Sequence, residues 1–267
     1  MYPTLSKSYK NTFPFKIGST SFIYPDGYEV NVKILAPYLN EIELLMLESS
    51  PDSLPTKRQI KRLAALANDF DISYNVHLPT DIYLGDLDPN RRQYAIDAVK
   101  RVIDLTQALS PSTYTLHLPY DEMSVAGNRL RKWQDAIYES MDRLLLIDIN
   151  SETISIETLM YPFEWVETIV TSFQLSVCLD IGHLILQNVD IEGFYKSHER
   201  KISIVHLYGV NDQHEHLSLD RLSEKDMESI VEILKAFSGV VSMEVFSYDH
   251  LRTSLDYLER CWFQGQR

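Results

Sequence analysis

The sequence predicts an α/β protein built as a single (β/α)8 TIM barrel. Its 267 residues suit one large core, because barrels of this kind take about 250 residues. Short β-rich runs alternate with helical patterns along the whole chain, and neither a linker nor a low-complexity stretch interrupts them. Because eight such units occur, we expect the sheet to close. Residues 1–14 are then an N-terminal extension, and residues 15–267 form the catalytic barrel.

Eight runs have the composition of strands that are buried on both faces of a sheet. They are rich in β-branched and aromatic residues, and Val240, Val241, Met243 and Val245 in the last run are typical. The predicted strands are residues 15–22, 41–49, 73–79, 113–119, 153–159, 175–183, 202–209 and 239–246.

Three of the intervening segments carry clear helix signals. In residues 56–70 the apolar positions Ile60, Leu63 and Ala67 recur at helical spacing. A second helix is expected to start at Asp88-Pro89, with the aspartate as N-cap and the proline in the first turn. A third is expected over residues 223–237.

Acidic and imidazole side chains occur in the second halves of six consecutive predicted strands. Two of them share a pattern at an offset of 40 residues, Tyr-Asn-Val-His-Leu-Pro and Tyr-Thr-Leu-His-Leu-Pro. Catalytic residues of a (β/α)8 barrel collect at this end of the strands, and carboxylates that converge there repel one another unless cations compensate. The six residues are His77, His117, Glu157, Asp180, His206 and Glu244.

Two adjoining segments add ligands of the same kind. Asp180-Ile-Gly-His183 places another imidazole after strand six, and we expect Gly182 to allow a sharp turn there. After strand seven, Asp212 and His214 are two residues apart, so on an extended segment they point to one side. Histidine beside aspartate and glutamate suits zinc first, with manganese or iron as alternatives.

With these nine positions the sequence resembles the xylose-isomerase-like barrels, which include the endonuclease-four type of apurinic-site nuclease. The resemblance spans residues 15–246 and implies a site for up to three divalent metal ions. It implies one ion on His77, His117 and Glu157, a second shared by Glu157 with Asp180, His206 and Glu244, and a third on His183, Asp212 and His214.

Within that superfamily the chain looks closest to the cobamide-remodelling phosphodiesterases. The similar blocks are residues 20–26 (Thr-Ser-Phe-Ile-Tyr-Pro-Asp), 41–45 (Glu-Ile-Glu-Leu-Leu), 75–81 and 116–121. This resemblance implies a metal-dependent phosphodiesterase that hydrolyses the nucleotide loop of a cobamide such as cobalamin. Bound metal ions would activate water, Glu157 would bridge two of them, and Glu244 would accept a proton. Glu48 and His216 are candidates for orienting the ligands.

Other functions remain open from the sequence. A sugar isomerase or epimerase would need only Glu157, Asp180, His206 and Glu244 around one metal ion, which leaves the other five positions without a shared purpose. An apurinic-site endonuclease would use all nine. A noncatalytic corrinoid- or metal-binding barrel is a further alternative.

Charge and composition exclude some classes of binding partner. The formal net charge of −13 argues against binding to a long nucleic acid, because that affinity comes from Lys and Arg displacing counterions. No apolar run approaches the ~18 residues that span a bilayer, and the two cysteines are too few for a disulfide framework. We therefore expect a cytoplasmic enzyme with a small-molecule substrate.

Overall fold

The computed structural model describes residues 2–120, 128–211, 213 and 215–264. Eight parallel strands close into a barrel in sequence order, and β8 pairs with β1. The strands are β1 (Lys16–Thr20), β2 (Glu41–Leu45), β3 (Ser73–His77), β4 (Tyr114–Leu116), β5 (Ile154–Glu157), β6 (Ser176–Asp180), β7 (Ile202–Leu207) and β8 (Val240–Met243). The predicted (β/α)8 TIM barrel is confirmed.

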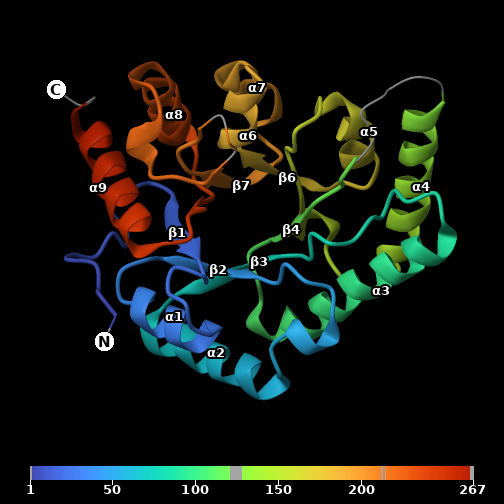
Figure 1. The fold of residues 1–267 in the computed structure, drawn as a ribbon, viewed down its shortest axis with the longest axis horizontal. Helices are drawn as coiled ribbons and strands as arrows, with labels where there is room; N and C mark the ends of the chain where they lie inside the picture. Colours follow the sequence, from blue (N-terminus) through green and yellow to red (C-terminus); the bar gives the residue numbers. More distant parts are fainter. Residues whose placement is uncertain (1, 121–127, 212, 214, 265–267) are drawn as a thin grey trace.

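Helices surround this barrel (Figure 1). They are α1 (Tyr28–Leu35), α2 (Lys57–Phe70), α3 (Pro89–Thr106), α4 (Arg129–Leu144), α5 (Glu164–Ser172), α6 (Ile181–Leu186), α7 (Ile191–His198), α8 (Glu224–Ala236) and α9 (Tyr248–Gln264). The three helices with clear sequence signals begin as predicted. Asp88 accepts a hydrogen bond from the Asn90 amide at 2.9 Å, and Ser223 accepts one from the Asp226 amide at 3.1 Å.

All eight predicted strands are present, but each is shorter than its apolar run. At a functional position, β6 ends at Asp180 rather than at 183. The Asp180 carboxylate accepts the amide of His183 at 2.7 Å and thereby caps α6. His183 therefore lies on a helix, because capping at Asp180 turns the chain out of the sheet.

The interior of the barrel is polar, although such interiors are usually filled by branched apolar side chains. Fully buried side chains on the inward side of the strands include Glu43, Asn75, Thr115, Ser155 and Ser242. The Ser242 hydroxyl on β8 donates to Glu43 on β2 at 2.6 Å, which bridges over β1 and is possible only inside the barrel. Apolar residues on the alternate positions face the helices and form the main core.

The segment before β1 packs on the barrel domain through its own apolar side chains. Leu5, Tyr9 and Phe13 are buried, and the Tyr9 hydroxyl donates to Asp256 on α9 at 2.6 Å. Phe13 also lies edge-on to Trp262 of the same helix.

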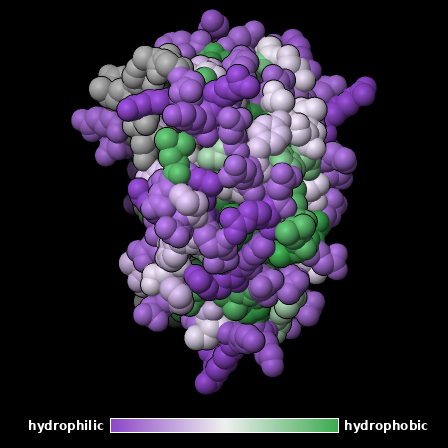
Figure 2. All heavy atoms as spheres, turned by 90° about the vertical axis from the view of Figure 1, so that its right-hand side faces the viewer, coloured by the Kyte–Doolittle hydropathy of each residue, from purple (hydrophilic) through white to green (hydrophobic). Residues whose placement is uncertain are grey.

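The face drawn in Figure 2 is mostly hydrophilic, with hydrophobic residues in small separate groups. Among the helices of the described residues, none has both the length and the apolar content that crossing a bilayer requires.

Candidate metal centre

Six of the nine predicted ligands come together at the carboxyl ends of the strands. His77, Glu157 and Asp180 are the last residues of β3, β5 and β6, and His206 is the second to last of β7. His117 and Glu244 follow directly after β4 and β8. Parallel strands all end at the same rim, so residues far apart in the sequence meet there.

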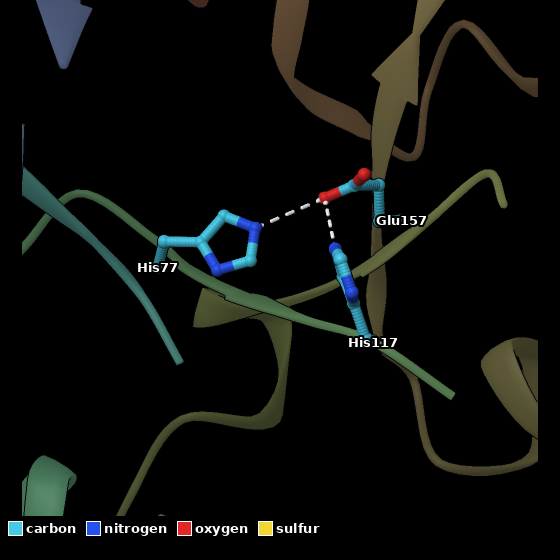
Figure 3. Close-up of side chains that lie close together, drawn as sticks. All are labelled: His77, His117 and Glu157. Carbon is cyan, nitrogen blue, oxygen red and sulfur yellow. Dashed lines mark hydrogen bonds and ion pairs between the residues drawn. The ribbon is translucent and has the colours of Figure 1, made fainter. Parts of the chain in front are cut away.

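Glu157 contacts several histidines of this group, and Figure 3 shows it between His77 and His117. Its Oε2 atom is 3.3 Å from His77 Nε2, 2.9 Å from His117 Nε2 and 3.6 Å from His206 Nδ1. The other nitrogen of His77 lies 2.9 Å from the carbonyl oxygen of Leu78, to which only a protonated Nδ1 can donate. In its neutral form His77 therefore presents the lone pair of Nε2 to Glu157, as a metal ligand must.

A second group lies beside the first and consists of Asp180, His206 and Glu244. One potential ligand atom from each falls within 4.8 Å of the others. His206 Nδ1 and Glu244 Oε2 are 3.2 Å apart without the alignment of a hydrogen bond, and both are buried and lack any hydrogen-bond partner among the described residues. Buried polar atoms without partners are rare, and a cation between these two would satisfy both.

His183 approaches both groups from the start of α6. Its Nδ1 atom is 3.2 Å from Asp180 Oδ2 and 3.6 Å from Glu157 Oε1, and it lies 3.0 Å from the carbonyl of Thr158. Asp212 and His214, which the resemblance pairs with His183, lie outside the described residues.

Charge in the cluster is balanced by imidazoles and protons. Burial alone would lower the pKa of His77, but the hydrogen bond and charge of Glu157, with Glu43 and Glu244, raise it to about 9. Burial raises the pKa of Asp180 to about 7. Burial opposes ionisation of Glu157 too, yet His117 and its neighbours hold the pKa of that carboxyl well below its usual range. A divalent ion would displace the protons on such groups, so the donor set fits a metal.

Glu43, which the sequence reading did not single out, lies directly beneath the cluster. It is fully buried, and its Oε1 atom is 3.1 Å from His206 Nε2. Glu48, which the sequence analysis predicts to orient the ligands, is exposed, and its backbone carbonyl accepts a hydrogen bond from the Ser53 hydroxyl. The signal was available in the alternation of Glu41-Ile-Glu43, since period two places Glu43 on the inward face of a buried strand.

His216 and Tyr208 border the cluster above β7. The two rings stack with centroids 3.8 Å apart, and His216 Nδ1 lies 3.0 Å from the backbone carbonyl of Glu244. The Tyr208 hydroxyl donates to Asp180, at 3.0 and 3.1 Å from its two carboxylate oxygens. Tyr208 thus orients a candidate ligand, a role that the sequence reading did not assign.

Gly182 has a different purpose from the one expected. It lies in the first turn of α6, and a Cβ built there would come within 2.4 Å of the Tyr208 ring. The chain does turn from β6 into α6 here, but Gly182 is helical, and its missing side chain makes room for the tyrosine that holds Asp180.

Comparisons with known proteins agree with this architecture. A family model described as a xylose isomerase-like TIM barrel matches residues 39–261. Among solved structures, a D-tagatose 3-epimerase-like protein has a TM-score of 0.76 at 18% identity, covering 95% of this chain and 100% of its own. The IOLI protein, solved with a zinc atom, has a TM-score of 0.66 at 15% identity and coverages of 94% and 96%. An AP endonuclease, family 2, from Brucella melitensis has a TM-score of 0.64 at 15% identity and coverages of 95% and 98%.

These identities are low, so the structural likeness by itself shows the shared fold. No curated protein matches the sequence significantly. The family model, however, extends over most of the chain and includes every candidate ligand named above. The chain therefore belongs to the xylose isomerase-like TIM barrel family.

Proposed function

We propose that this protein is a metal-dependent phosphodiesterase acting on a small phosphodiester. The observation that carries the proposal is the position of Glu157, whose Oε2 atom lies within 3.6 Å of ring nitrogens of His77, His117 and His206. One carboxylate thus belongs to more than one candidate set of ligands, so Glu157 could be shared by two metal ions.

The chain's residues divide naturally between two ion positions. His77 and His117 with Glu157 would hold one ion, and Asp180, His206 and Glu244 would hold the next. His183 would serve a third together with Asp212 and His214. Zinc, or alternatively manganese or iron, would activate water and neutralise the charge that develops on the phosphate and the leaving oxygen.

Glu244 is our choice for the proton acceptor. Burial opposes its ionisation, but His206 lowers the pKa of this carboxyl, so it stays ionised at neutral pH. It is slightly exposed, at 7%, whereas Asp180 is fully buried. An ionised carboxylate at the open side of the cluster can take the proton that water loses on attack.

The rim of the site has apolar surface for the rest of a substrate. Phe22, Met160 and Phe246 are exposed at 39%, 43% and 46%, and they lie in the segments that follow β1, β5 and β8. Exposed large apolar side chains in the segments after the strands suit a substrate with an extended apolar face. The cobamide nucleotide loop, attached to a flat corrin ring, is the phosphodiester that the sequence resemblance implies.

A sugar epimerase is the second candidate, favoured by the similar solved structures, several of which are sugar epimerases. Such an enzyme would use one ion on Glu157, Asp180, His206 and Glu244. It gives no role to the close approach of His77 and His117 to Glu157, which is why we place it second.

The test replaces one histidine that only the phosphodiesterase needs. We expect zinc-loaded wild-type protein to hydrolyse bis-p-nitrophenyl phosphate, with loss of activity in chelator and recovery on adding metal. His117→Ala should lower the rate by more than about 100-fold, since even the partners of metal ligands are worth 10–100-fold. It should also lower the bound metal, whereas the control His250→Ala, on α9, should change neither.

Substrate identity needs a separate measurement. Incubation with adenosylcobalamin, followed by chromatography and mass measurement, should yield a corrinoid that lacks its lower-ligand base. If no phosphodiester is cleaved and a ketose such as D-tagatose is converted by wild type and His117→Ala alike, the protein is an epimerase and our proposal is wrong.

A further inference from the structure

We propose that Glu43 is a positioning residue for metal binding, which fixes the ring of His206 so that its Nδ1 lone pair faces the ion held with Asp180 and Glu244. This inference rests on the metal site of the proposed function, and it does not depend on which reaction that site performs.

Glu43 is held firmly in the barrel interior. It comes from β2, is fully buried, and accepts the Ser242 hydroxyl of β8 on Oε2 at 2.6 Å. Its other oxygen, Oε1, lies 3.1 Å from Nε2 of His206 on β7. The two oxygens of this carboxylate thus connect β2 to two other strands.

The two ring nitrogens of His206 face different carboxylates. Nε2 faces Glu43, whereas Nδ1 faces Glu244 Oε2 at 3.2 Å and Glu157 Oε2 at 3.6 Å. An ionised carboxylate only accepts hydrogen bonds, so Glu43 favours the tautomer with its proton on Nε2. The lone pair of neutral His206 is then on Nδ1, among the ligand oxygens.

The contact between Glu43 and His206 is close but lacks hydrogen-bond alignment. Glu43 Oε1 and both ring nitrogens have no hydrogen-bond partner among the described residues, so a small rotation of the imidazole toward Glu43 satisfies two buried atoms together. Cys178 also contacts the ring, but a thiol is a weak acceptor and cannot replace the carboxylate.

The energetics favour the same role. Burying an ionised carboxylate costs folding free energy unless an opposite charge or strong hydrogen bonds compensate it. Within the described residues, Glu43 has neither a lysine nor an arginine among its ion-pair partners; its partner is His206. A cation on the far nitrogen of that imidazole makes the Nε2 proton a stronger donor, which stabilises the carboxylate below it.

Glu41 provides a matched control on the same strand. It is also fully buried and lies two residues earlier, on the same inward face of β2. Its carboxylate binds the side chains of Ser73, Ser112 and Asn75 and pairs with Lys16 at 3.7 Å, and no histidine is among these partners. Glu41→Gln therefore removes a buried charge from the same strand without touching the imidazole.

The experiment measures zinc affinity by competition with a chromophoric chelator. Glu43→Gln should weaken zinc binding about 10–100-fold, the usual effect of removing a partner of a metal ligand. Glu41→Gln should stay near the wild-type affinity, and Ser242→Ala, which frees Glu43, should weaken binding less than Glu43→Gln. Circular dichroism of each variant shows whether it is folded.

Nitrogen-15 NMR of the histidine rings is measured on zinc-loaded wild-type protein. Its result therefore does not depend on whether any variant folds. We expect His206 to be protonated on Nε2 and coordinated through Nδ1. Coordination through Nε2, or equal loss of affinity in Glu43→Gln and Glu41→Gln, overturns the inference. Wild type that binds zinc without cleaving a phosphodiester contradicts the proposed function alone, and wild type that binds no zinc contradicts both.

Discussion

Gly182 shows how one missing side chain supports the candidate site. The Tyr208 ring occupies the space that a Cβ at 182 would fill, and the Tyr208 hydroxyl donates to Asp180. Burial raises the pKa of this phenol, so it remains a donor at any physiological pH. Asp180 also caps α6 through the His183 amide. Strand, helix and candidate ligand therefore all depend on the room left at position 182.

Gly182→Ala should disturb both stability and metal binding. The added methyl would come within 2.4 Å of the Tyr208 ring, and overpacking of this kind costs about 1–3 kcal/mol. We expect a lower midpoint of denaturant unfolding, and weaker zinc binding because Asp180 loses the hydrogen bond from the Tyr208 hydroxyl.

Gly27→Ala is the control for that substitution. A Cβ at Gly27 has nothing within 4 Å. If both alanine variants unfold at the wild-type midpoint and bind zinc equally well, the close approach of residue 182 to Tyr208 affects neither stability nor metal binding.

Residue by residue, the described candidate ligands lie together, whereas the side chains that support them were not predicted. The candidate ligands stood out because His and carboxylates interrupt apolar runs at the strand ends. Glu43 was missed because its importance depends on His206, which is 163 positions further along the chain and beside it only in the closed barrel. Tyr208 was missed for the same reason, since nothing local links it to Asp180.

At the scale of elements, the type and order of the strands followed from the sequence, whereas their ends did not. β4 has only three residues, Tyr114–Leu116, although its apolar run continues to Pro119. Apolar residues that follow a strand stay buried under the rim segments, as Leu78 and Leu118 do. The buried apolar run is therefore longer than the hydrogen-bonded strand. Hydrophobic pattern reports burial, and the strand ends where backbone pairing stops.

The start of α3 offers a prediction at this scale. Asp88 accepts the amide of Asn90, and Pro89 follows in the first turn. Asp88→Ala leaves that amide without its partner and should lower the free energy of unfolding by about 1 kcal/mol. Denaturant unfolding measures the change.

Asp88→Asn separates capping from charge. Asparagine caps as well as aspartate, so this variant should keep most of the wild-type stability. An equal loss in both variants would assign the effect to the carboxylate charge rather than to the cap.

For the molecule as a whole, closure of the barrel concentrates charge at one end. Glu43, Glu157, Asp180 and Glu244 come from four different strands or strand ends and are all buried. The ion pairs found for them among the described residues are with histidines alone. Such a site must take up protons or cations, and which of the two it holds depends on pH.

The zinc affinity of the whole protein should therefore rise with pH. His77, with its pKa raised to about 9, and Asp180, with its pKa raised to about 7, must lose their protons to act as ligands. Below these values each proton released on binding weakens the apparent affinity about tenfold per pH unit. Zinc titrations from pH 6.5 to 9 measure the slope.

Folding stability should change in the opposite sense when a chelator is present. The raised pKa of His77 stabilises the folded state fully below the unfolded value of 6.5, and this contribution is lost as pH rises through about 9. Asp180 acts with the same sign, because a carboxyl whose pKa is raised to about 7 favours the folded state only while it is protonated. The melting temperature in chelator should thus fall between pH 6.5 and 9, and zinc should remove most of that fall. A melting temperature in chelator that is flat or rising over this range, combined with a zinc affinity independent of pH, would mean that these groups do not form one proton-binding and metal-binding unit.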